Sequence, residues 1–318
     1  MRGWKCYTPA GLIGYRVLVF QHVGPLEKVA RAAILDGCCM RAILGVAALG
    51  TVLLACAFEA LFGCSPSNFA GCSNWLFVPI SGVPEHHILP SVAWHGRLMV
   101  LAWAILMPAA FVVARFYKIT PGQDWPRRLD NPFWFVTHRR LGYVIAILTI
   151  AALGFVIWGR GGLILWQNHH AIVGWGMFSL TCFQVIGSLL RGTHGGPVNP
   201  FTRQLRSPEQ WPGDHFSLTR RRIFFEYSHK LVGYLLVLLA AWAIVSGLHA
   251  ADAPRWMWIV IGFWTLICVG AFVYLQRSGR CIDTYQAIWG LDDTLPGYRR
   301  KPIGWGITRI DPNARHKK

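Results

Sequence analysis

Residues 91–113 read SVAWHGRLMVLAWAILMPAAFVV, a long apolar run that indicates a membrane protein. It holds one charged residue, Arg97, in a run of otherwise almost wholly apolar side chains. A helix of about 20 apolar residues crosses the roughly 30 Å hydrocarbon core of a bilayer. The stretch therefore predicts a membrane-spanning helix, and this helix carries a histidine, His95, close to its start.

Five more apolar blocks of similar length share this pattern. With the stretch above, taken as Ser91–Val113, they lie at Ala42–Phe62, Leu141–Trp158, Ala171–Leu190, Leu231–Leu248 and Trp256–Leu275. Charged residues make up 14% of the chain, whereas a soluble domain usually carries about 25%. The sequence predicts an all-α fold, a polytopic membrane bundle of six transmembrane helices.

The basic residues fix an orientation for this bundle. If the two ends of the chain share a side, 27 Lys and Arg residues fall in segments on that side and 2 on the other. Because basic residues accumulate in cytoplasmic segments, we expect both termini in the cytoplasm. The net charge of +17 is then a topology signal that favours contact with membrane lipid, and nucleic acid is not an expected partner.

The resulting map has a basic cytoplasmic segment at 1–40, a membrane domain at 41–275 and a basic cytoplasmic tail at 276–318. An alternative concerns the N-terminus, where the apolar run that follows Arg41 and ends at Cys56 is typical of a signal peptide. Residues 1–39 would then be an over-extended start, and five spans would remain. Cys64 and Cys72 lie in the first outer connection, where a disulfide and two free thiols are both compatible with the compartment.

Four of the twelve histidines occupy equivalent places, within a turn or two of the start of four consecutive blocks: His95, His138, His170 and His229. Consecutive spans are antiparallel, so the first and third fall near the outer face and the other two near the cytoplasmic face. Two pairs at two depths are what two bis-histidine haems require, because each iron takes one imidazole above and one below. The alternative for each histidine taken alone is a polar side chain satisfied within a helical core.

Glycines support the haem interpretation. Three of the histidines have a glycine four residues later, on the same helix face, at Gly142, Gly174 and Gly233. A flat macrocycle can approach the backbone where a side chain is missing. His169 competes with His170 as a ligand, and the glycine at 174 favours His170.

The local sequences resemble a known family. Residues 94–103, WHGRLMVLAW, resemble the opening helix of the cytochrome b561 domain, and its next three helices are similar to WFVTHRRLGY (134–143), HAIVGWGMFSLTCFQVIGSLLRG (170–192) and FEYSHKLVGY (225–234). The motifs IDTYQAIWG (282–290) and PGYRRKPIGWG (296–306) are similar to the tails of bacterial members that lack an attached soluble domain. The resemblance covers about residues 80–306.

The resemblance implies two haem b groups held by the central four helices of a six-helix bundle in a bacterial inner membrane. It implies that His95 pairs with His170 and His138 with His229, which is also the pairing reached from topology. Arg97 and Lys230 are candidate partners of haem propionates or anionic substrates, although snorkelling to the interface is an equal alternative. In the long cytoplasmic loop, His194 and His215 are candidates for a donor site.

The expected function is transmembrane electron transfer, from a cytoplasmic-side or quinone donor to an acceptor across the membrane, as in a ferric reductase-like oxidoreductase. One alternative is a haem b subunit that exchanges electrons with quinone or anchors a dehydrogenase, and a homodimer is compatible with either. A His-lined metal transporter and a haem-free structural subunit are alternatives of another class. A transporter would need carboxylates beside the histidines, and Glu59 is the only acid expected well inside a span.

Overall fold

The structure, a computed structural model, describes residues 74–83, 87–162, 168–199 and 204–311. The chain divides into two compact units, Met1–Asn74 and Trp75–Lys318, and every helix named below belongs to the second. The predicted span Ala42–Phe62 and the segment of the signal-peptide alternative lie outside the described residues. Cys64 and Cys72 also lie outside them.

Five helices in the described part of the chain are long and apolar enough to cross a membrane. They are α3–η2–α4 (Pro90–Met99, Val100–Leu106 and Met107–Phe116, one continuous span), α5 (Phe133–Arg160), α6 (His169–Leu189), α7 (Arg220–Ala250) and α8 (Arg255–Arg277). The all-α membrane fold is confirmed, and so are five of the six predicted spans.

Two of these helices begin well before the apolar blocks that predicted them. α5 begins at Phe133 instead of Leu141, and α7 begins at Arg220 instead of Leu231. The first turns of both helices contain arginines, so they were not counted as part of an apolar block. Charged residues do not prevent a segment from being helical. The side chain of Thr219 accepts a hydrogen bond from the Arg222 amide and so caps the start of α7. The longer helices carry His138 and His229 well inside their own boundaries.

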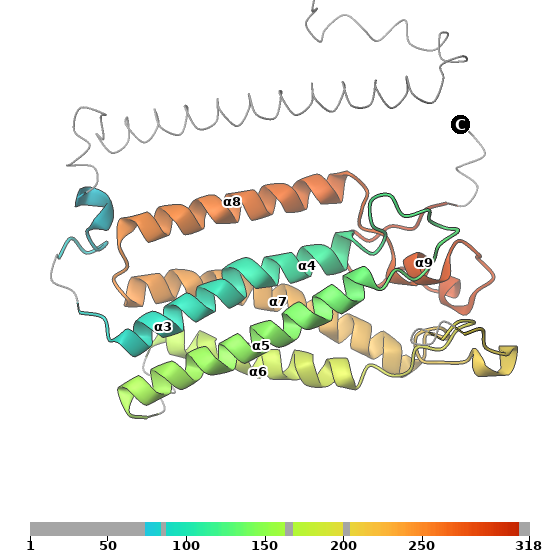
Figure 1. Cartoon of the computed structure of the whole chain (residues 1–318), viewed down its shortest axis with the longest axis horizontal. Helices are drawn as coiled ribbons and strands as arrows, with labels where there is room; N and C mark the ends of the chain where they lie inside the picture. The colour runs from blue at the N-terminus through green and yellow to red at the C-terminus, as the bar shows by residue number, and fades with distance from the viewer. Residues whose placement is uncertain (1–73, 84–86, 163–167, 200–203, 312–318) are drawn as a thin grey trace, which may run out of the picture. The chain divides into compact units, whose positions relative to one another are not determined.

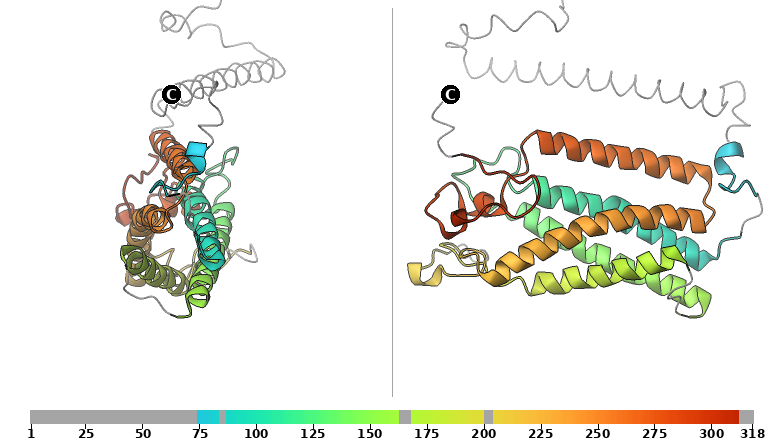
Figure 2. Two further views of the ribbon diagram at one scale, coloured as in Figure 1. Left: turned by 90° about the vertical axis from the view of Figure 1, so that its left-hand side faces the viewer. Right: turned by 180° about the vertical axis from the view of Figure 1, so that it is seen from behind.

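The helices α4, α5, α6 and α7 surround a common interior, and α8 lies to one side of them (Figures 1 and 2). α3 packs mainly against α5, and α6 packs mainly against α7. The buried core is apolar and is formed by side chains from η2, α4, α5, α6 and α7. Its residues are Ala102, Trp103, Ala110, Ile145, Met177, Leu236 and Ala240. The helix α8 has no fully buried residue within this chain, as expected of a helix that faces lipid.

A proline shapes the first span. Pro108 has no N–H to donate to the carbonyl of residue 104, one turn earlier, and the preceding segment, Val100–Leu106, is a π-helix. The Trp264 indole N–H of α8 donates to the Ala104 carbonyl at 2.6 Å. A backbone carbonyl without a partner is costly in a membrane. This contact is one of several that attach α8 to the first span, together with the hydrogen bonds from Arg115 of α4 to the Gln276 side chain of α8.

One end of the bundle is closed by the C-terminal part of the chain, which contains α9 (Thr284–Trp289) and η4 (Pro296–Arg299). The Gln286 side chain is fully buried and bonds both the N–H and the carbonyl of Ile310. The Tyr285 hydroxyl donates to the Phe216 carbonyl, in the loop between α6 and α7. We call this end, where α5 and α7 begin, the α9 end, and the opposite end, where α3 and α6 begin, the α3 end (Figure 1).

Candidate functional site

Two pairs of imidazole rings meet inside the bundle. The rings of His95 and His170 have their centres 6.1 Å apart and their planes at 86°. The rings of His138 and His229 have their centres 5.9 Å apart and their planes at 85°. The structure thus brings together the two pairs that topology predicted. His169, the competitor of His170, is exposed.

The two pairs lie near opposite ends of the membrane helices. On α5, Ala152 is 14 positions beyond His138, and its carbonyl oxygen lies 3.0 Å from His95 Nδ1. At 1.5 Å per residue this separates the pairs by about 20 Å along the bundle. Ile145 and Leu236, each seven positions beyond a histidine of the α9-end pair, belong to the buried apolar layer that lies between the pairs.

Three of the four rings are fixed in the same way. The Nδ1 atoms of His95, His138 and His170 lie 3.0, 3.1 and 3.1 Å from the carbonyl oxygens of alanines on neighbouring helices, Ala152, Ala110 and Ala243. A carbonyl oxygen only accepts, so Nδ1 carries the proton and Nε2 keeps a free lone pair. This tautomer is the one that a metal-ligating histidine with a backbone partner adopts.

The fourth ring breaks the pattern. Each of the three acceptor alanines lies 14 or 15 positions after the histidine of its own span. On α6, the position 14 residues after His170 holds Gln184 instead of an alanine. Its side-chain amide donates to the backbone carbonyl of His229 at 2.8 Å. His229 Nδ1 is buried and has no hydrogen-bond partner among the described residues. Its ring is instead stacked on Phe225, with centres 5.1 Å apart.

A cavity of about 560 Å³ opens beside the α9-end pair, and both of its histidines line it. This volume is in the range of sites for cofactors and other small molecules. Six basic residues and one acid are among its lining: Arg115, Lys118, Arg139, Arg191, Arg222 and Lys230, with Glu226. The cavity therefore suits a flat, largely apolar group that carries negative charge at one edge.

Comparison with known proteins adds a family relationship. No family model and no solved structure matches the chain. Its relatives include two Arabidopsis thaliana proteins: a cytochrome b561, DM13 and DOMON domain-containing protein, 24% identical over 206 residues, and a cytochrome b561 and DOMON domain-containing protein, 26% identical over 207 residues. Human ferric-chelate reductase 1 is 26% identical over 147 residues.

These alignments cover 63%, 61% and 46% of this chain, and 20%, 42% and 22% of the relatives, respectively. The chain thus spans less than half the length of these relatives. The chain is a relative of the cytochrome b561 proteins.

Glycines near the histidine rings of this b561 relative either leave open space beside a ring or allow a ring to pack closely against a neighbouring helix. The predicted Gly142 and Gly233 line the cavity, next to the α9-end pair, and a Cβ added at Gly142 or Gly174 would meet no atom within 4 Å. Sequence reasoning missed Gly247 on α7, where an added Cβ would lie 2.9 Å from His170 Cε1. Nothing in the spacing along the chain indicates Gly247, because its role depends on how α6 packs against α7.

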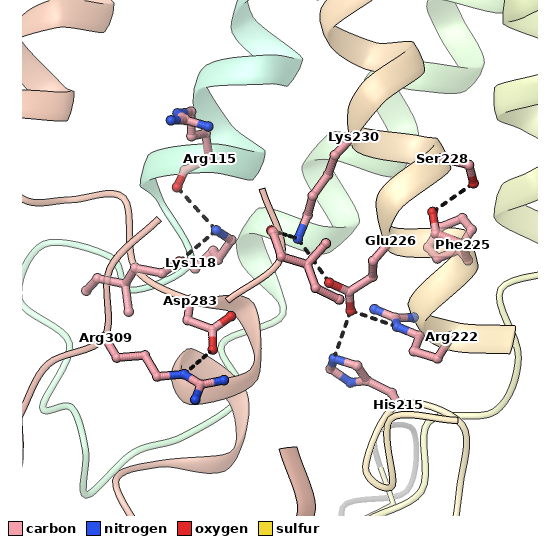
Figure 3. A network of polar contacts seen from close by, with 12 residues as sticks. Arg115, Lys118, His215, Arg222, Phe225, Glu226, Ser228, Lys230, Asp283 and Arg309 are labelled. Atoms are coloured by element: carbon pink, nitrogen blue, oxygen red, sulfur yellow. Dashed lines mark hydrogen bonds and ion pairs between the residues drawn. The ribbon is translucent and has the colours of Figure 1, made fainter. Parts of the chain in front are cut away.

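The acid of the cavity is held by two cations of its own helix. Glu226 is buried, and its carboxylate accepts from Arg222 Nε at 2.9 Å and from Lys230 Nζ at 3.0 Å (Figure 3). Glu59, which was expected to be the only acid well inside a span, lies outside the described residues. That expectation missed Glu226, because α7 begins earlier than predicted. The spacing Arg-Glu-Lys at i, i+4 and i+8 was the available signal.

The two cations predicted to bind a cofactor have different surroundings. Lys230 lines the cavity and also donates to the Ile303 carbonyl at 2.7 Å. Arg97, at the α3 end, is exposed, and its guanidinium lies 5.2 Å from the centre of the Trp94 ring. Lys118, which follows α4, is a further buried cation, and burial, followed by the charge of Lys230, lowers its pKa to about 8.

His194 and His215, in the loop between α6 and α7, form a cluster next to Glu226 of the cavity lining. The rings of His194 and His215 lie 5.6 Å apart, and Trp289 of α9 contacts both. His215 is buried, and its Nε2 lies 3.9 Å from a Glu226 carboxylate oxygen (Figure 3). Burial, and then the nearby Arg222 guanidinium, hold the pKa of His215 well below its usual value.

Proposed function

We propose that this chain transfers electrons across a membrane through two haem b groups, one between His95 and His170 and one between His138 and His229. The relationship to cytochrome b561 proteins implies haem b. Relatives named cytochrome b561 and ferric-chelate reductase support transmembrane electron transfer as the general activity. The number of haems and the identity of their ligands are inferred from the geometry of the rings.

The spacing of the rings is the observation that carries the proposal. An imidazole nitrogen lies about 2 Å from a metal that it ligates and about 1 Å from its own ring centre, so two axial imidazoles have centres roughly 6 Å apart. The measured values are 6.1 and 5.9 Å. A metal ion bound without haem needs three or more protein ligands, whereas a haem supplies four nitrogens and needs only the two imidazoles of each pair.

The side chains and backbone of the chain would position and tune these groups, and the haem iron would supply a one-electron couple. The Ala152, Ala110 and Ala243 carbonyls hold three imidazoles in the ligating tautomer. Lys230 and Arg191 line the cavity and can pair with the propionates of one haem. For the other haem, we propose Arg97, two positions beyond His95, as the corresponding cation.

The charges also support an orientation. The connections after α4 and α6 and the chain after α8, which are rich in Lys and Arg, meet at the α9 end (Figure 1). The positive-inside rule assigns such an end to the cytoplasm. We therefore propose a bacterial inner-membrane protein that accepts electrons from a cytoplasmic reductant or a quinol. The acceptor across the membrane would be a species such as a ferric chelate, since that substrate appears in the name of a relative.

Haem content tests the proposal. We expect two haem b per chain in detergent-purified protein from a haem-replete host, counted as the pyridine haemochrome. His95→Ala and His138→Ala should each retain one haem, and the double variant should retain none. His169→Ala is the matched control, because this exposed histidine adjoins a proposed ligand, and it should retain both haems. Wild-type protein that purifies folded but without haem would sink the proposal.

A further inference from the structure

The two histidine pairs differ in the charge around them. At the α3 end, His95 and His170 bond to neutral groups, the carbonyls of Ala152 and Ala243 and the Ser246 hydroxyl. Arg97, the cation nearest to His95 in the sequence, is exposed and lies over an indole ring. An exposed charge is screened by solvent and ions and acts weakly on a buried group.

At the α9 end, the pair faces a positively charged cavity. Its lining holds six cations and one carboxylate, so two haem propionates would still leave three positive charges in excess. Arg139 and Arg191 both lie over the Phe135 ring, and neither forms an ion pair with a carboxylate of the described residues. Burial, followed by the charges of Arg222 and Arg139, lowers the pKa of the Arg191 guanidinium.

Positive charge near a haem favours its reduced form. Reduction adds one negative charge to the site, and nearby cations stabilise that charge most where burial limits the access of water. The excess of cations at the α9 end therefore raises the midpoint potential of a haem there relative to one at the α3 end.

The hydrogen bonds of the ligands act in the same direction. A histidine that donates its Nδ1 proton to a carbonyl becomes a more basic ligand, which stabilises the oxidised iron. Both histidines of the α3-end pair have such an acceptor, whereas at the α9 end His138 has one and His229 Nδ1 has none among the described residues.

We infer that the α9-end site has the more positive midpoint potential of the two, so that one electron shared between the sites resides mainly at the α9 end. The inference rests on the proposed function. The exchange moves one electron: the α3-end site is oxidised, the α9-end site is reduced, and no bond or proton changes. A membrane potential that is negative on the α9 side attracts the electron toward the α3 end. The distribution of the electron between the two sites then depends on membrane voltage.

A redox titration of the purified protein with both haems bound tests this ordering. We expect two separate waves in the wild type. Arg191→Gln, which removes one cavity cation, should lower only the wave at higher potential. The expected change is about a tenfold fall in the ratio of reduced to oxidised haem, equivalent to about 59 mV for a one-electron couple. Arg191→Lys keeps the charge and should leave both waves in place, which separates charge from shape.

Two further variants test the sign of the shift in midpoint potential and which end of the bundle causes it. Glu226→Gln removes the one acid of the cavity lining and should move the higher wave upward, and Arg97→Gln should leave that wave unchanged. A shift of the lower wave in Arg191→Gln, a shift of neither wave, or a single wave in the wild type would overturn the inference. Each of these results still requires two haems per chain, so they are distinct from the loss of haem that would refute the proposed function.

Discussion

His170 Nδ1 lies 3.1 Å from the carbonyl oxygen of Ala243, which is 73 positions further along the chain. The same relationship links His95 with Ala152, and His138 with Ala110 of α4. An alanine side chain is small enough to let an imidazole reach the backbone of a neighbouring helix. The carbonyls then set which ring nitrogen faces the interior, and this repeated contact makes the two histidine pairs candidates for haem ligands.

Gly247→Ala should disrupt the α3-end pair without unfolding the bundle. The added methyl would lie 2.9 Å from His170 Cε1 and 3.3 Å from Nδ1, closer than carbon atoms normally approach. We expect the variant to lose one of its two haems, measured as the pyridine haemochrome. Gly262→Ala on α8, where an added Cβ meets no atom within 4 Å, is the control. Retention of two haems in Gly247→Ala would contradict the packing described here.

Trp264→Phe should weaken the attachment of α8. The substitution removes the N–H that donates to the Ala104 carbonyl and leaves that carbonyl without this donor. The expected loss is about 1–3 kcal/mol in the free energy of unfolding, visible as a lower Tm in detergent. Trp258→Phe on the same helix is the matched control, because its indole nitrogen is buried without a hydrogen-bond partner in the described residues. Equal effects of the two substitutions would rule out the proposed role of the bond.

His215→Phe should make the protein less sensitive to acid. The pKa of buried His215 lies well below its usual value because burial, and then Arg222, disfavour the charged ring; His194 and Arg191 add to this, and Glu226 opposes it. In the unfolded chain the same ring titrates at about 6.5. Below that pH the unfolded state binds a proton that the folded state does not, so stability falls as pH falls.

The measurement for this prediction is Tm between pH 7.5 and 5. The wild type should lose more stability over this range than His215→Phe, and His169→Gln, at an exposed histidine, should behave like the wild type. An identical fall of Tm in the wild type and in His215→Phe would show that His215 does not control the acid sensitivity.

Hydropathy and spacing predicted most of what positions the site. Five apolar blocks appear as membrane helices, and antiparallel alternation of those helices predicted which histidines meet. Such reasoning works because the length of a span and the alternation of its direction depend on the bilayer and hardly on side-chain packing.

The remaining features depend on contacts between helices. The acceptors of the imidazole protons are backbone carbonyls, which every residue has, so the sequence gives no sign of them. Gly247 is recognisable only once α6 and α7 are packed together. Glu226 was missed because the charged first turns of α7 do not count as membrane-spanning in an apolar window, although Arg222 and Lys230 compensate its charge.

Electron paramagnetic resonance of the oxidised protein distinguishes two bis-histidine haems from one haem or from haems with a single histidine ligand. The ring planes in the two pairs are nearly perpendicular, at 86° and 85°, and perpendicular axial imidazoles leave two iron d orbitals almost equal in energy. We expect low-spin ferric signals of strong anisotropy that integrate to two haems per chain, with one lost in His95→Ala. A predominantly high-spin signal, or a spectrum that integrates to one haem in the wild type, would contradict this expectation.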